Sequence, residues 1–195
     1  MKVEKHFLFL SSAPLKDNRN FMVSLSEFGV DLLTLEFFAP NRGEWIGNAE
    51  SFAEIEPLLS LIHDDLGVSM SILVTHQHTA FEDKLLNEAF AYFPNMALFP
   101  TDVLMKEMSF GDYSSYGDLL ALFRGVPYDL MVTASTYLRC GLDACLSARK
   151  LFVHRNTFNY RLNGFIAATG LDIRDYHNAL LLELYLQLSN GKMGQ

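Results

Sequence analysis

The chain has few cysteines and no long apolar run, and both absences limit the class of protein. Its 195 residues include two cysteines, Cys140 and Cys145, whose spacing matches neither a zinc-binding pair nor a redox CxxC motif. The apolar run at residues 7–10 is shorter than the ~7–15 residues of a secretion signal. No stretch approaches the ~20 apolar residues of a membrane span. We therefore expect a cytoplasmic protein with buried free thiols and no membrane partner.

Motifs that carry catalysis are also scarce. The sequence contains no glycine-rich phosphate loop, GxSxG or HExxH motif. His76 and His78 alternate at the end of a predicted strand, and side chains that could join them in space are His63, Asp64 and Asp65. Two histidines without a third ligand at a fixed offset predict a metal site poorly, so surface or capping histidines are favoured. We expect no catalytic residues, no metal, no cofactor and no enzyme activity.

Basic charge is scarce as well, and it is unevenly distributed. The net charge is −8. Residues 1–127 hold eight Lys and Arg against eighteen Asp and Glu, whereas residues 128–195 hold seven against five. This asymmetry predicts an acidic body joined to a mildly basic C-terminal part. Because the basic excess is small, a single copy would bind a nucleic acid weakly.

Hydrophobic residues make up 50% of the chain, which is enough for a buried core and excludes a disordered protein. In the first 108 residues, apolar periodicity alternates between the strand and helix patterns. The expected elements are a strand at 6–11, a helix at 17–28, a hairpin of 31–38 with 44–46, a helix at 51–66, a strand at 69–75, a helix at 80–92 and a strand at 97–99. This order predicts one layered α/β domain over 1–108, for sensing or dimerisation. A linker with a short helix follows at 109–127.

Residues 128–195 have helical periodicity throughout, so the predicted fold class is α+β. Within them, residues 141–162 (GLDACLSARKLFVHRNTFNYRL) predict two helices joined by a tight corner. Ala144, Ala148 and Leu151 recur at three- and four-residue spacing, and a second apolar stripe begins at Phe158 and Leu162. Two such helices crossing at a steep angle form a helix-turn-helix.

The opposite face of the second of these helices has an unusual composition. A 3.6-residue period points Asn156, Asn159, Tyr160 and Asn163 outward, although Asn is a poor helix former. Asn and Arg side chains can form bidentate hydrogen bonds with base edges, and Arg and Tyr can bind phosphate. The face therefore indicates a DNA-binding surface, and the alternative is a polar face that only confers solubility.

Residues 151–162 (LFVHRNTFNYRL) closely resemble the LFVHRNTLRYRL signature of the PucR/CdaR-type bacterial transcription regulators. The resemblance extends back to Tyr137 and forward to Asp172, and it covers roughly the C-terminal third of the chain. The sequence departs from the family pattern at residues 140–142, and at Asn159 and Asn163, where basic residues are common. These departures leave open which bases are contacted.

The resemblance implies a sequence-specific transcription regulator that binds double-stranded DNA as a homodimer, with a small-molecule effector that the sequence does not identify. The charge of −8 and the Asn-rich face keep an alternative open, a protein-interaction or ligand-sensing module whose helix-turn-helix no longer binds DNA. The candidate DNA-binding residues are Arg149, Lys150, His154, Arg155, Asn156, Thr157, Asn159, Tyr160, Arg161 and Asn163.

Residues 66–89 also resemble part of the central domain of these regulators, which in the family is a degenerate relative of diguanylate cyclase domains. A cyclase hairpin carries a Gly-Gly-Asp/Glu-Glu-Phe run, because glycines admit the nucleotide and carboxylates hold Mg²⁺. The hairpin here, residues 40–45 (PNRGEW), has one glycine and one carboxylate. We therefore expect no cyclase activity.

The predicted final helix, residues 175–188, is apolar around nearly its whole circumference, with Glu183 and Gln187 as its polar strip. A helix that is apolar all round is expected to be buried all round. Either the rest of the chain or a second subunit would cover it. A dimer interface is favoured, because helix-turn-helix proteins use a two-fold axis to bind two half-sites.

Overall fold

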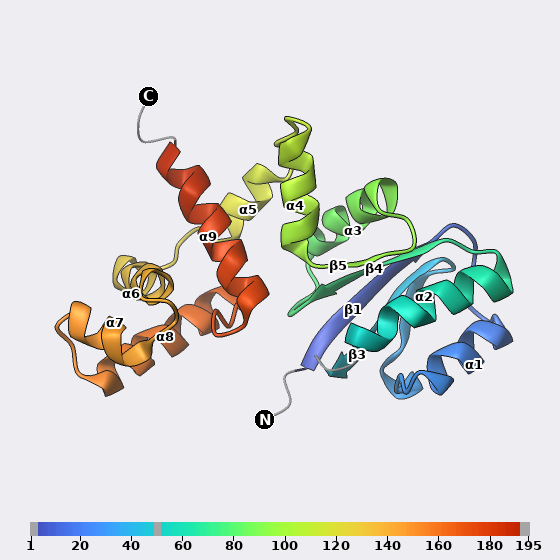
Figure 1. Ribbon diagram of the computed structural model, residues 1–195, viewed down its shortest axis with the longest axis horizontal. Helices are drawn as coiled ribbons and strands as arrows, with labels where there is room; N and C mark the ends of the chain where they lie inside the picture. The colour runs from blue at the N-terminus through green and yellow to red at the C-terminus, as the bar shows by residue number, and fades with distance from the viewer. Residues whose placement is uncertain (1–3, 49–51, 192–195) are drawn as a thin grey trace. The chain divides into compact units, whose positions relative to one another are not determined.

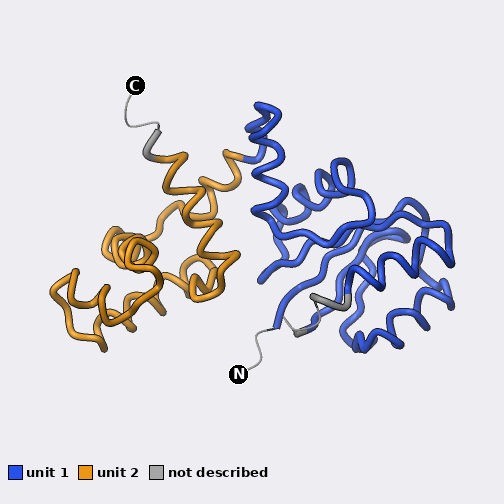
Figure 2. The backbone as a smooth tube through the Cα atoms, viewed as in Figure 1, with its two compact units in different colours: residues 1–115 blue, residues 116–195 orange. Residues whose placement is uncertain are grey.

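The computed structural model describes residues 4–48 and 52–191. The chain divides into two compact units, Met1–Ser115 (unit 1) and Tyr116–Gln195 (unit 2), which Figure 2 colours separately. Unit 1 combines a mixed sheet with helices and unit 2 is helical, which confirms the α+β fold class. Among the described residues, no helix has the length and apolarity that a membrane crossing requires.

Unit 1 is built on one five-stranded sheet with the order β2-β3-β1-β4-β5. The central strand β1 pairs antiparallel with both β3 and β4, whereas β4 pairs parallel with β5. The predicted hairpin is present as β2 and β3, preceded by the 3-10 helix η1 (Leu32–Thr34) within the expected first strand. The strands are β1 (Glu4–Ser11), β2 (Glu36–Ala39), β3 (Arg42–Asn48), β4 (Met70–Thr75) and β5 (Ala97–Leu98).

Helices cover both faces of this sheet, as Figure 1 shows. On one face, Phe7 and Phe9 of β1 share a buried core with α1 (Arg19–Glu27) and α2 (Phe52–Leu66). On the other face, α3 (Ala80–Tyr92) packs against β1 and β4. All six residues of β4 are buried. The strand predicted at 69–75 is confirmed, and both of its faces are buried because β4 lies between two helical layers.

One helix of unit 1 escaped the sequence prediction. The sequence predicts no helix between the strand at 97–99 and the linker, but Pro100 begins α4 (Pro100–Ser109). Proline suits the first turn of a helix, because that position needs no N–H donor. The Asp102 carboxylate accepts a 2.8 Å hydrogen bond from the Phe99 N–H and caps the start. The signal was present in the sequence as Pro followed by Asp within one turn.

Unit 2 packs its helices around a small aromatic core. Phe158 and Phe165 are fully buried, and the Phe123 ring lies 6.3 Å from Phe165 and 4.3 Å from Tyr185. The short helix predicted within residues 109–127 is present. The expectation of buried thiols is wrong, because Cys140 is half-buried and Cys145 is exposed. The helices are α5 (Tyr116–Leu122), α6 (Tyr128–Arg139), α7 (Ala144–Lys150), α8 (Arg155–Thr169) and α9 (Tyr176–Gly191).

The final helix α9 is not buried around its whole circumference. Leu181 and Leu182 are buried within the chain, Leu184 and Leu188 are half-buried, and Gln187 is exposed. The rest of the chain, one of the two expected covers, therefore buries only part of this helix. Leu182 belongs to the core of the chain, so it is unavailable to a second subunit.

Candidate nucleic-acid interface

The helix-turn-helix is formed by α7 and α8, and each helix has a side chain that caps its start. The Asp143 carboxylate accepts a 2.8 Å hydrogen bond from the Leu146 N–H. At the start of α8, His154 Nδ1 accepts from the Asn156 N–H at 3.2 Å. This bond requires Nδ1 to be unprotonated, which makes Nε2 the N–H donor of the neutral ring. His154 thus caps the N-terminus of α8.

Packing against α6 sets the rotation of α8 about its own axis. The Phe158 ring lies 5.7 Å from the ring of Tyr137 on α6, and burial raises the pKa of the Tyr137 phenol above its ordinary value. Gly164 faces Leu130, and a Cβ at Gly164 would stand 3.3 Å from the Leu130 methyl groups. The glycine lets the two helices approach closely. These contacts fix the orientation of α8 relative to α6.

The outward face of α8 is the one that the 3.6-residue period predicted. Asn156, Asn159 and Asn163 are exposed, and the Tyr160 side chain is 78% exposed. Hydrogen-bonding groups thus lie along about two turns of a helix whose opposite side is fixed in the core. The arrangement leaves these side chains free to meet the edges of bases.

Cationic side chains flank this face, and the structure separates them into two kinds. Arg149 and Lys150 at the end of α7 are exposed, as is Arg155 in the first turn of α8. The neutral Thr157 beside Arg155 is also exposed. Arg161 differs, because its Nε lies 3.4 Å from the Asp129 carboxylate of α6 and its side chain is about one-third exposed. An ion pair this exposed adds little stability. Arg161 would have to exchange Asp129 for a phosphate in order to bind DNA.

Two histidines of unit 1, His6 and His78, take part in a separate polar network. His78 Nδ1 lies 3.2 Å from the Glu44 carboxylate and its Nε2 lies 3.2 Å from Asp83. His6 Nδ1 contacts the same Glu44 carboxylate at 3.2 Å. Within residues 4–48 and 52–191, no group of three or more His, Cys, Asp and Glu side chains has the arrangement of a metal site. Both ring nitrogens of His78 thus contact carboxylate oxygens.

The hairpin glycine of unit 1 has a packing role. A Cβ on Gly43 would overlap the Glu36 carbonyl oxygen of the paired strand and would stand 2.8 Å from the Phe9 ring. The glycine is thus required by the close approach of β2 and β3 over an aromatic core. Its presence at the hairpin needs no nucleotide to explain it.

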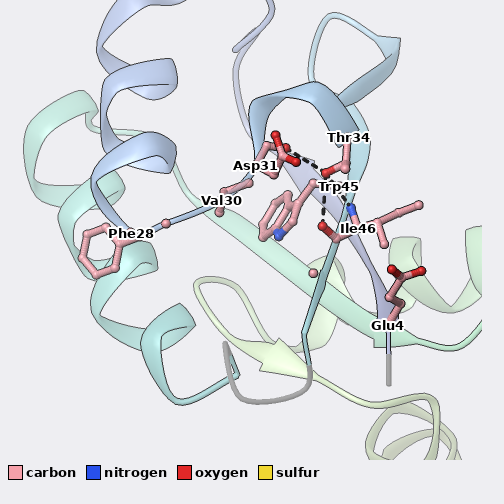
Figure 3. A pocket seen from close by; sticks show the side chains of 9 residues that line it. Glu4, Phe28, Val30, Asp31, Thr34, Trp45 and Ile46 are labelled. Atoms are coloured by element: carbon pink, nitrogen blue, oxygen red, sulfur yellow. Dashed lines mark hydrogen bonds between the residues drawn. The ribbon is translucent and has the colours of Figure 1, made fainter. Parts of the chain in front are cut away.

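Unit 1 also contains a pocket of about 220 Å³ beside the end of β3, which sequence reasoning missed. Figure 3 shows Trp45, Asp31 and Glu4 around it. Thr34 closes one side, because its hydroxyl donates to the Asp31 carbonyl at 2.8 Å and accepts from the Ile46 N–H at 3.1 Å. Ligand pockets typically enclose ~300–1,000 Å³, so a nucleotide would not fit. Two carboxylates would also repel an anion.

A family comparison matches the C-terminal part of the chain. The model of the family described as "PucR C-terminal helix-turn-helix domain" matches residues 130–188, which run from α6 into α9. Two curated relatives match over 60 residues, or 31% of this chain. The Carbohydrate diacid regulator of Escherichia coli (strain K12) is 39% identical, and the Uncharacterized protein YxkF of Bacillus subtilis (strain 168) is 37% identical. The matches span 16% and 20% of those proteins.

A solved structure aligns over more of the chain but less closely. The crystal structure of the Regulator of Polyketide Synthase Expression from Bifidobacterium adolescentis aligns with 98% of this chain and 82% of its own, at 19% identity and a TM-score of 0.46. The family match therefore covers only residues 130–188, the part of unit 2 that contains the helix-turn-helix.

Proposed function

The chain is of the PucR/CdaR type, with its helix-turn-helix domain at residues 130–188, and from this premise we propose that it is a transcription regulator that binds double-stranded DNA. The observation that carries the proposal is the outward face of α8, where three Asn side chains and Tyr160 are exposed. In this motif the second helix enters the major groove with its N-terminal residues nearest the bases. Asn156 and Asn159 occupy that part of α8.

We assign the candidate residues two roles according to their positions. Asn156, Asn159, Tyr160 and Asn163 contact base edges, because they share the exposed face of α8. Arg149 and Lys150 bind phosphates from the end of α7, since their exposed side chains lie beside the corner. Of the remaining candidates, His154, Arg155 and Thr157 surround the N-terminus of α8, where N–H groups favour an anion. Arg161 binds a phosphate once it has left Asp129.

Selection of bound sequences from random duplex DNA, repeated at two salt concentrations, tests the proposal. We expect an enriched motif and an affinity that falls steeply with salt, because each phosphate contact releases counterions. If binding shows neither an enriched motif nor a salt dependence, the helix-turn-helix does not bind DNA. The alternative of a protein-interaction or ligand-sensing module would then stand.

Two alanine variants separate base contacts from phosphate contacts. Asn159→Ala should weaken binding to the preferred site by about 1–3 kcal/mol and relax the preference at one or two base positions. Lys150→Ala should weaken binding about equally on all sequences and lower the salt slope by about one. Repeating the selection with both variants measures these effects. If both variants lose affinity uniformly with unchanged base preference, the Asn face does not determine sequence specificity.

We also propose that the regulator acts as a homodimer. A two-fold protein binds two half-sites about one helical turn apart, and the weak basic excess of residues 128–195 favours two copies over one. On α9, Leu180, Leu184 and Leu188 form a half-buried stripe at four-residue spacing. This stripe is the surface that we assign to the second copy, because Leu182 is already buried in the chain.

The dimer should be present at micromolar concentration and should depend on the α9 stripe. Leu184→Glu is expected to shift the protein towards a folded monomer in sedimentation, because a charge at the centre of an apolar interface must be desolvated. Gln187→Glu, on the exposed part of the same helix, is the matched control and should leave the dimer unchanged. A well-folded wild-type monomer would contradict the proposal, and the enriched DNA motif should then lack a near-palindrome.

A further inference from the structure

The turn between α7 and α8 closes on a phenylalanine in a left-handed conformation. Phe152 has a φ of 55°. Its N–H donates to the Arg149 carbonyl at 3.1 Å, and the Val153 N–H donates to the Ala148 carbonyl at 3.0 Å. These two hydrogen bonds are the Schellman closure of a helix C-terminus, in which the residue at the position of Phe152 is usually glycine. A side chain at this position is strained by contact between its Cβ and the backbone.

The same chain ends its other helices differently. Among the helices that the structure describes, α3 is followed by Asn95 with positive φ, and Asn is a residue type that tolerates this conformation. A glycine with φ between 64° and 83° follows, within three residues, each of α1, α2, α4, α5, α6 and α8. Backbone requirements therefore favour glycine at the end of α7 as well. A large aromatic residue there needs another explanation.

Packing within the chain does not provide that explanation. The Phe152 side chain is 96% exposed. Leu142, which also has a positive φ, is half-buried, so its side chain contributes to the packing of the corner between α6 and α7. Phe152 combines backbone strain with exposure of a large apolar surface, and each of these disfavours the folded state. Such strain commonly marks a functional site.

We propose that the Phe152 ring contacts the DNA backbone, packing on a deoxyribose between phosphates bound by its basic neighbours. The inference rests on the proposed DNA binding and adds an apolar anchor to it. The surroundings favour a polyanion as the occupant, because exposed Arg149, Lys150 and Arg155 lie within three residues of Phe152. A deoxyribose offers the apolar surface that lies between phosphate charges. The contribution of the ring to DNA affinity therefore depends neither on salt concentration nor on base sequence.

Phe152→Gly is the variant that separates this role from a structural one. Glycine relieves the backbone strain, so the midpoint of chemical denaturation should not fall. Affinity for DNA should nevertheless fall roughly tenfold, because the apolar contact is lost. The loss should be about equal on the selected duplex and on an unrelated duplex, with an unchanged salt slope, since no phosphate contact is removed. A variant that gains stability while it loses binding cannot be explained by misfolding.

Two control variants complete the experiment. Phe152→Leu retains an apolar side chain and the backbone strain, and it should keep most of the wild-type affinity. Leu33→Ala removes an equally exposed apolar side chain from unit 1, where Leu33 is 95% exposed, and should leave affinity unchanged. If the denaturation midpoint of Phe152→Gly does fall, retained affinity in Phe152→Leu supports the proposal, and a tenfold loss in Phe152→Leu overturns it.

The outcomes distinguish this inference from the proposed function. If wild-type protein binds DNA with salt dependence and Phe152→Gly binds equally well, the ring does not touch DNA and only the present inference fails. If Phe152→Gly keeps its DNA affinity but loses self-association in sedimentation, Phe152 contacts a second copy, which also overturns the inference. If wild-type protein shows no salt-dependent binding, the proposed function itself fails.

Discussion

Replacing Phe158 with alanine is expected to destabilise unit 2 by about 3–5 kcal/mol, the range for a large aromatic side chain removed from a core. Phe158 is fully buried, and its ring lies 5.7 Å from the ring of Tyr137. Total stabilities of about 5–15 kcal/mol are usual, so much of unit 2 should unfold at moderate denaturant. DNA binding should fall with it, because this contact sets the orientation of α8. Chemical denaturation followed by circular dichroism measures the shift in midpoint.

Asn159→Ala provides the matched control for this variant. Asn159 is the next residue on the same helix and is exposed, and alanine is the better helix former. Its denaturation midpoint should therefore stay at or slightly above that of the wild-type protein. If Phe158→Ala unfolds at the wild-type midpoint, α8 does not pack on α6 through Phe158. The outward direction of the Asn side chains would then lose its physical basis.

Gly43→Ala should destabilise unit 1 by about 1–3 kcal/mol or more, the range for overpacking a filled site. The added Cβ would overlap the Glu36 carbonyl oxygen in β2 and approach the Phe9 ring to 2.8 Å. Backbone on one side and a fully buried ring on the other leave little room for relaxation. The expected result is a lower denaturation midpoint for the β2–β3 hairpin region, which loss of Trp45 fluorescence can follow, since the chain has one tryptophan.

Gly117→Ala makes the same chemical change where the surroundings are open. A Cβ at Gly117 would have no neighbouring atom within 4 Å, and the residue lies inside α5 without positive φ. Because alanine favours a helix over glycine by about 1 kcal/mol, this variant should be slightly more stable than the wild-type protein. If Gly43→Ala and the wild-type protein have equal denaturation midpoints, close packing does not require a glycine at this position.

Local sequence patterns predicted most of the order of helices and strands in unit 1. The predicted sequence of strand, helix, hairpin, helix, strand, helix and strand agrees with the structure, because helix and strand periods are properties of neighbouring residues. The burial of β4 on both faces did not follow from its alternation, since covering layers come from distant segments. The helix after Pro100 was missed because proline both ends strands and begins helices.

At the candidate interface, the sequence by itself determined which side of α8 faces outward. Phe158 and Leu162 are buried at helical spacing, and Asn159 and Asn163 are therefore exposed. This result needed no knowledge of the partner helix, because the 3.6-residue period converts sequence position into direction.

Only the tertiary structure decided which of the other candidate contact residues are already paired, which are buried and which are exposed. Arg161 is paired with Asp129 on α6, Leu182 is buried within the chain, and Phe152 is exposed on a strained turn. The first two facts depend on segments that meet through folding, and residue spacing along one helix does not encode such meetings. The third depends on how the backbone closes between α7 and α8, because a left-handed residue other than glycine has no periodic signature.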